Sequence, residues 1–388
     1  MIDSESNSTN IAKRRDIMSR QPFDPKELQI RAMHPCGGVQ MMRDNMGISG
    51  FPDMEPLYNR PISEKENFKL WFEGKKPYYL PTAGWVMCDV NVFRPRMHPD
   101  NVAAHLIFDG EPIYQYQTDT MEGWFGLKWK YVPVAGGSTV EPGHPMIEDM
   151  SEWKSILTMP NLDDMDWESM AANNKEYLNT SQHNQLGILS GFWERLISLM
   201  DMEGAAMAMI DEDQEEGLHS FFDQYADLLI DYIDRMKKYC DIDGVLIHDD
   251  WGHQNGPFFS LDTAMNLLVP HLRKVTDAVH ERGMYFELHS CGKNEALVPA
   301  YIAAGVDLWC PQVINNVEML AEKYKDQPIT FGMQGIDVAP DATEDEQRKA
   351  AEKWFDTFKN YRVIPAFMNS TPAISSTLYK LSREYYME

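Results

Sequence analysis

The chain has 388 residues, of which 43% are hydrophobic and 24% are charged, and its formal net charge is −25 at pH 7. These proportions are typical of a globular protein with a large core, built as one large domain or two of ordinary size. The acidity argues against non-specific binding to nucleic acid or to an anionic membrane surface, because both require basic patches.

Cysteine usage and the N-terminal residues indicate a reducing compartment. The N-terminal stretch MIDSESNSTNIAKRRD lacks the apolar segment of a secretory signal, and no later apolar run is long enough to cross a bilayer. We therefore expect a cytoplasmic protein without a membrane partner. The cysteines are odd in number and lack disulfide-like spacing: Cys36, Cys88, Cys240, Cys291 and Cys310.

The first part of the chain is expected to be an extension, with residues 1–60 as a polar tail and irregular segment and residues 61–388 as one domain. His34 and Cys36 are separated by one residue, but Pro35 and the following glycines predict no strand, so we interpret this pair as structural. A helix is predicted over 63–72 and a first strand over 78–82.

An inserted β-hairpin or meander is predicted over residues 123–134, where GWFGLKWKYVPV alternates aromatic and apolar residues before a glycine pair. The aromatic side chains of this insertion either line a substrate pocket or pack as in any small sheet, and the sequence leaves both open.

From about Met150 onward the pattern changes to helices separated by short strands. Repeated βα units with short connections predict a parallel sheet covered by helices, and a count approaching eight favours an α/β fold of the TIM (β/α)8 barrel type. No GxGxxG or P-loop motif follows any strand. The predicted strands are 186–191, 244–248, 284–289, 306–309, 328–332 and 362–367. The predicted helices are 192–239 with a break near 211–216, 261–282 with Ser260 as N-cap, a kink at Pro270 and Gly283 as C-cap, 294–304, 317–325, 343–359 with a Thr343–Glu346 capping box, and a last helix from about 375.

Polar side chains follow five of these strands in succession, at the ends where TIM barrels carry their active sites. Strand ends also carry turn and cap residues, so a structural role for each residue alone stays open. The catalytic candidates are His248, Asp249 and Asp250. The substrate-binding candidates are Trp251, Gln312, Gln334 and Asn369.

His289 and Cys291 stand at the end of the predicted strand 284–289. Alternate residues of a strand share a face and lie roughly 6.6 Å apart, so one metal ion can reach both side chains. A thiolate beside an imidazole suits zinc, although a buried histidine next to an inert thiol is the structural alternative. Catalytic zinc needs at least three protein ligands. Cys310 on the next strand is the preferred third ligand, and the His248–Asp250 pair is the competing source.

Three nearby carboxylates have different expected roles. Glu287 faces the same side as Cys291, but lies roughly 13 Å from it along an extended strand. Asp249 and Asp250 are adjacent and point in opposite directions, so one is expected to face the cavity and the other to cap a loop. The sequence leaves open which of the two faces the cavity.

These motifs resemble the uroporphyrinogen decarboxylase superfamily. The resemblance is carried by DGVLIHDDWG, FELHSCG, AGVDLWCPQ and ITFGMQGID, between residues 243 and 337, and more weakly by WFEGKKPYYLPT. It implies a TIM barrel. The superfamily includes cobalamin-dependent methyltransferases whose zinc is held by an HxC motif and a distant cysteine, and His289-Ser290-Cys291-Gly292 matches that motif. In those enzymes the other cysteine follows the last strand, where this chain has AFMNS and no cysteine.

The resemblance implies a zinc-dependent methyltransferase that works with the cobalamin (corrinoid) of a partner protein, since the chain has no corrinoid-binding DxHxxG stretch. Zinc would act as Lewis acid on a small methyl donor such as a methoxylated aromatic (O-demethylation), or would activate an acceptor thiol for methylation by methylcobalamin. The absent cysteine and the aromatic segment Trp124 to Trp129 favour the donor.

Two further classes stay open beside methyl transfer. One is a metal-free decarboxylase, although the arginine-rich motif that would hold a porphyrinogen is absent from this acidic chain. The other is a non-enzymatic binding protein on the same fold. The oligomeric state is left open, a homodimer included.

Overall fold

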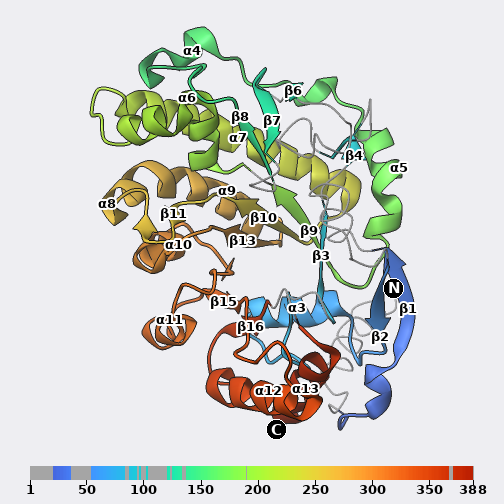
Figure 1. Ribbon diagram of the computed structural model, residues 1–388. Helices are drawn as coiled ribbons and strands as arrows, with labels where there is room; N and C mark the ends of the chain where they lie inside the picture. Colours follow the sequence, from blue (N-terminus) through green and yellow to red (C-terminus); the bar gives the residue numbers. More distant parts are fainter. Residues whose placement is uncertain are drawn as a thin grey trace, which may run out of the picture.

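The computed structural model describes residues 21–35, 54–83, 87–93, 96–97, 102–103, 120–122, 125–132, 137–188, 190–366 and 370–387. Seven strands form a central sheet in the order β16–β15–β14–β13–β10–β9–β3, and every neighbouring pair is parallel (Figure 1). The strands are β3 (Val90–Phe93), β9 (His183–Ile188), β10 (Gly244–His248), β13 (Tyr285–His289), β14 (Leu308–Trp309), β15 (Thr330–Met333) and β16 (Val363–Pro365).

Helices alternate with these strands, as the sequence pattern predicts, and their apolar faces form the core with the sheet. The Thr343 capping box and the Ser260 cap are both present. A π-helical turn over Ala264–Leu268 ends two residues before Pro270, where a kink is expected, and α9 begins at Val269. The helices after the strands are α6 (Phe192–Ala208), α7 (Glu215–Cys240), α8 (Leu261–Thr263), α9 (Val269–Glu281), α10 (Val298–Ala303), α11 (Val317–Lys323), α12 (Glu344–Phe358) and α13 (Pro372–Tyr385).

The segment 78–82, predicted as the first strand, is not a regular strand. It nevertheless joins the two edges of the sheet. The Ala83 N–H donates to the carbonyl of Pro365 on β16 (2.9 Å), and the Asp89 N–H, just before β3, donates to the carbonyl of Thr82 (2.9 Å). Pro81 has no N–H to donate, which limits regular pairing here. The segment therefore takes the eighth position of the barrel without forming a ladder.

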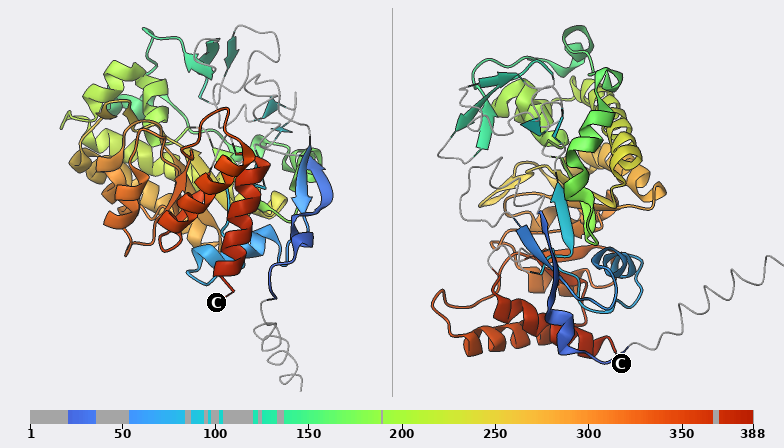
Figure 2. Two further views of the ribbon diagram at one scale, coloured as in Figure 1. Left: turned by 60° about the horizontal axis from the view of Figure 1, so that its bottom comes forward. Right: turned by 90° about the vertical axis from the view of Figure 1, so that its right-hand side faces the viewer.

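The N-terminal extension is more ordered than the sequence predicts. β1 (Ile30–Pro35) and β2 (Met54–Tyr58) form an antiparallel ribbon on the outside of the domain (Figure 2). His34 on β1 is buried, with Nε2 3.0 Å from the carbonyl oxygen of Tyr177, while Cys36 lies outside the described residues.

A buried ion pair attaches the extension to the C-terminal helix. Glu27, in the 3-10 helix η1 (Pro25–Leu28), accepts hydrogen bonds from Arg383 Nε (2.7 Å), Arg383 Nη2 (2.9 Å) and the Tyr379 hydroxyl (2.5 Å). Because both charges are buried and paired, the two ends of the chain are held together on α13.

The predicted insertion is a meander of β6 (Thr120–Glu122), β7 (Lys128–Val132) and β8 (Gly137–Val140), at the top of Figure 1, far from α12 and α13. Phe125 is buried under Arg195 and beside Tyr225, so this aromatic ring packs into the core. Trp124 lies outside the described residues.

No helix of the described chain combines the length and apolarity that a membrane crossing requires. Several short elements complete the described chain. These elements are α3 (Glu64–Phe72), β4 (Arg96–Met97), β5 (Val102–Ala103), η4 (Met150–Glu152), α4 (Trp153–Ile156), η5 (Leu162–Asp164), α5 (Trp167–Leu178), β11 (Gly252–His253), β12 (Gly256–Pro257) and η7 (Glu295–Leu297).

An ion pair between α9 and the residue before β14 should make stability depend on pH. His280 Nε2 lies 2.7 Å from Asp307 Oδ2, and this hydrogen bond raises the pKa of His280 above its usual 6.5. Because the pKa of His280 is higher in the folded than in the unfolded state, the pair stabilises the protein fully at pH values below the pKa of the unfolded state. This stabilisation is lost as the pH rises through the pKa of the folded state. We expect His280→Asn to lower the free energy of unfolding by at most about 1 kcal/mol near pH 5.5 and by less near pH 8, because solvent screens the partly exposed pair.

Urea unfolding of wild type and variant at the two pH values measures this difference. His144→Asn, at an exposed histidine, is the control for the loss of an imidazole and is measured at the same two pH values. A loss for His280→Asn that is the same at both pH values would contradict the assignment.

Candidate metal centre

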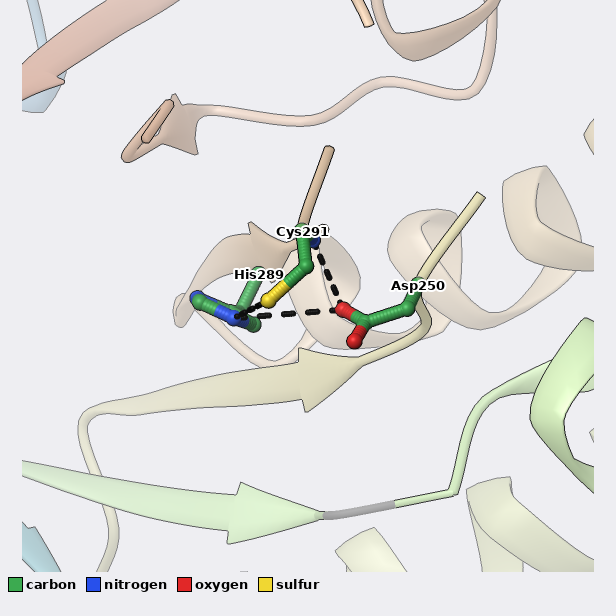
Figure 3. Close-up of side chains that lie close together, drawn as sticks. All are labelled: Asp250, His289 and Cys291. Atoms are coloured by element: carbon green, nitrogen blue, oxygen red, sulfur yellow. Dashed lines mark hydrogen bonds and ion pairs between the residues drawn. The ribbon is translucent and has the colours of Figure 1, made fainter. Parts of the chain in front are cut away.

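Three side chains converge where β10 and β13 end (Figure 3). Asp250 stands two residues beyond the end of β10, His289 is the last residue of β13, and Cys291 follows it. His289 Nε2 lies 3.2 Å from Cys291 Sγ and 3.9 Å from Asp250 Oδ1, and the three ligand atoms all lie within 4.8 Å of one another.

The register of the two strands explains this convergence. β10 and β13 pair in parallel with His248 opposite His289, so the residues after both strands meet at the same edge. The chain then turns at Gly292, whose φ is +97° and where any Cβ would stand 2.3 Å from the Gly252 carbonyl carbon. This close approach admits only glycine. The Cys291 N–H donates to Asp250 Oδ1 (2.7 Å), which fixes the carboxylate beside the thiol.

The three side chains fit a zinc ion. Zinc–ligand bonds of about 2.0–2.3 Å in a tetrahedral site separate nitrogen, oxygen and sulfur ligands by roughly 3.4–3.6 Å. The 3.2 Å and 3.9 Å separations at His289 lie on either side of that range. Thiolate, imidazole and carboxylate are all zinc ligands, and three protein ligands leave the open position that a catalytic site requires.

The environment keeps both ligands of the HxC motif neutral when no cation is present. Burial lowers the pKa of His289, against the opposing effect of Asp250. Burial also raises the pKa of the Cys291 thiol, and the negative charges of Asp250 and Glu194 add to the rise. A cation bound here would therefore displace the thiol proton.

Gln312 completes the polar surroundings of the thiol. Its Nε2 donates to Cys291 Sγ (3.3 Å), and its Oε1 accepts from the Gly292 N–H (2.9 Å). The amide is held at both ends, so Gln312, expected to bind substrate, orients Cys291.

The two adjacent aspartates have different environments. Asp250 belongs to the group around His289, whereas Asp249 is 2% exposed and points toward α6. Its carboxylate accepts from the first three backbone N–H groups of α6 (2.9, 3.2 and 2.9 Å) and from Trp251 Nε1 (2.7 Å). Burial raises the pKa of Asp249 to about 6. Asp249, expected among the catalytic residues, is thus placed as a helix cap, because Gly191 at the N-cap of α6 has no side chain to do so.

Cys310, the expected third ligand, is not in the group. Its thiol hydrogen-bonds Glu287, and a Cβ on Gly332 would lie 2.2 Å from Cys310 Sγ. Glu287 also accepts from Gln185 Nε2 (2.9 Å). The structure thus places Asp250, from the competing His248–Asp250 pair, where Cys310 was expected.

Some of the remaining candidates lie near the strand ends around His289, and others lie in the core. The His248 ring lies 4.5 Å from the His289 ring, and Gln334 Nε2 donates to the Cys310 carbonyl (2.9 Å). Trp251 is fully buried against Phe259 and Tyr301, which places it behind the site and not on a substrate surface. Asn369 lies outside the described residues.

One residue near the site, Glu194, does not stand out in the sequence. It lies in the first turn of α6, and its Oε1 accepts from the Asp250 N–H (3.4 Å). Burial, with Asp250 and Asp249, raises its pKa well above the usual value. Looking for polar groups after β9, as after the later strands, would have found it.

Comparison with solved structures confirms the fold. No protein-family model and no curated protein matches the chain. A methyltransferase from Methanosarcina mazei is similar with a TM-score of 0.55 and 13% sequence identity, over 84% of this chain and 100% of that one. A B12-independent methionine synthase from Shewanella sp. W3-18-1 has a TM-score of 0.34 and 12% identity, over 60% of this chain and 67% of that one. The first likeness confirms the TIM-barrel type of fold.

Proposed function

We propose that this chain is a zinc-dependent methyltransferase that moves a methyl group from a small substrate, a methoxylated aromatic, to the corrinoid cofactor of a partner protein. The observation that carries the proposal is the convergence of Asp250, His289 and Cys291 at the carboxyl ends of β10 and β13. The fold shared with the Methanosarcina mazei methyltransferase supports methyl transfer over the other chemistries of the barrel.

The chain would contribute the metal ligands and the groups that hold them. His289 Nε2, Cys291 Sγ and an Asp250 carboxylate oxygen would hold the zinc. Zinc in this place supplies Lewis acidity toward the oxygen that leaves the methyl group. Gln312 directs the sulfur through its 3.3 Å hydrogen bond, and the Cys291 N–H holds the Asp250 carboxylate in place. Such partners keep ligands oriented before metal and substrate arrive.

The metal content of the purified wild-type protein tests the proposal first. We expect close to one zinc per chain by elemental analysis, and no stoichiometric zinc would contradict the proposal. The reaction is then followed by absorbance with reduced free corrinoid and a methoxyphenol. The expected products are methylcobalamin and the free phenol, because the phenolate takes up a proton when the methyl group leaves.

A chelator-treated sample is the control and should regain activity when zinc is added back. A second assay with methylcobalamin and a thiol distinguishes the alternative direction. Methylation of the thiol without demethylation of the methoxyphenol would replace the proposed donor by an acceptor, with the same ligands.

A further inference from the structure

A small cavity lies between α13 and the segment 79–83, at the β16 edge of the sheet. β16 is separated from β13, which carries His289, by β15 and β14, so this cavity belongs to another part of the barrel. The space in which the centre of a water-sized sphere can move is about 30 Å³. Widened by the radius of a water molecule, this space has a radius of roughly 3 Å. One small oxyanion fits this space. Among the lining residues are Arg60, Tyr79, Thr82, Ser370, Ser375 and Tyr379.

Arg60 brings two unsatisfied N–H donors to this cavity. Its Nε and Nη1 atoms are buried and have no hydrogen-bond partner. The guanidinium lies over the ring of Tyr379 (3.8 Å to the centroid) and near that of Tyr79 (4.8 Å), so two aromatic rings hold it in place. Buried guanidinium N–H groups without acceptors are unfavourable, and the described part of the chain supplies no acceptor for these two.

The neighbouring carboxyl groups have other partners. Asp89 is fully buried and accepts from the Tyr79 hydroxyl (3.2 Å) and the Thr82 N–H (2.9 Å). Burial raises the pKa of Asp89 to about 8, so this group is largely protonated at neutral pH. Glu27 is paired with Arg383. Asp89 acts on the Arg60 charge through space, but no carboxylate of the described residues accepts a hydrogen bond from Arg60 Nε or Nη1.

The start of α13 adds hydrogen-bonding groups and a favourable dipole to the cavity. Ser370 and Ser375 lie with their hydroxyl oxygens 2.7 Å apart, and Ser375 belongs to the first turn of α13. The N-terminal end of a helix of this length attracts anions. In TIM barrels the loops after the last strands and a nearby helix N-terminus frequently form anion sites, and α13 follows β16.

We propose that this cavity binds a small oxyanion of the phosphate or carboxylate class. Arg60 would supply the charge and two N–H donors, and the hydroxyls of Ser370 and Ser375 would hydrogen-bond the oxygens at the start of α13. The bound anion would link the loop before α3 to the C-terminal helix. This site does not depend on the proposed methyl transfer, because it shares no residue with the centre at His289.

Binding is tested on the full chain with inorganic phosphate and with acetate as probes, each against chloride at equal ionic strength. We expect a saturable rise of the thermal unfolding midpoint with at least one oxyanion, since a ligand that binds only the folded state stabilises it. By calorimetry, Arg60→Met should bind at least about tenfold more weakly than wild type, because a charge-assisted hydrogen bond is lost.

A second pair of variants keeps Arg60 and its ring contacts intact. Ser375→Val narrows the cavity and should also weaken binding at least about tenfold. Ser376→Val changes the next residue of α13, outside the lining, and should bind as wild type does. If Arg60→Met does not fold, this pair decides alone. Equal stabilisation by oxyanions and chloride in the wild type, or undiminished binding in Ser375→Val, would overturn the proposal.

Discussion

Replacement of Cys291 by alanine is expected to abolish the proposed zinc binding and, with it, the proposed methyl transfer. Loss of a direct ligand should weaken zinc binding by more than about 100-fold, the upper end of what the loss of an outer-sphere partner costs. Sγ of Cys291 is the single sulfur in the group with Asp250 and His289. Elemental analysis of the purified variant and the corrinoid methylation assay measure the two effects.

Cys310→Ala is the matched control, because it removes the thiol that the sequence favours as third ligand. Its sulfur is packed between Glu287 and Gly332, so this variant should keep its zinc. Gln185 continues to donate to Glu287 when the thiol is gone. Zinc lost from Cys310→Ala as well as from Cys291→Ala would contradict the position of Cys310 outside the group and restore the expectation from sequence, in which both thiols bind the metal.

Asp249→Ala is expected to destabilise the fold, by at least about 3 kcal/mol. The substitution leaves the first backbone N–H groups of α6 and the indole of Trp251 without their acceptor, and each buried unsatisfied group costs about 1–3 kcal/mol. Loss of a helix cap acts in the same direction. The free energy of unfolding, from urea denaturation in the presence of a chelator, measures this effect without a contribution from bound metal.

Asp250→Ala, at the adjacent position, separates the two roles. Its side chain is 38% exposed, so we expect less than about 1 kcal/mol change in the same unfolding experiment. Zinc should nevertheless be lost from the purified protein. A larger destabilisation by Asp250→Ala, with zinc retained in Asp250→Ala and lost from Asp249→Ala, would show that the carboxylates had been assigned the wrong way round.

Features that depend on neighbours in the chain were predictable from the sequence. The Ser260 cap, the Thr343 capping box and the alternation of strands with helices from β9 onward follow from local hydrogen bonding and apolar periodicity. The pairing of His289 with Cys291 is equally local, because alternate residues at a strand end face the same side. These features required no knowledge of the rest of the fold.

The third position of the site was decided only by tertiary structure. Asp249 and Asp250 are chemically identical, and their roles depend on where α6 meets the end of β10 and on the register that sets His248 opposite His289. The direction of the Cys310 thiol depends likewise on Glu287 and on the space above Gly332, which lie on neighbouring strands. The closure of the barrel by the segment 79–83 also depends on tertiary structure, because this segment hydrogen-bonds Pro365, which lies far away in the sequence. The sequence by itself thus determined the elements and the HxC pair, whereas contacts between distant strands selected Asp250. The physical reason is that hydrogen bonds and packing across a sheet leave no periodic pattern in a single sequence.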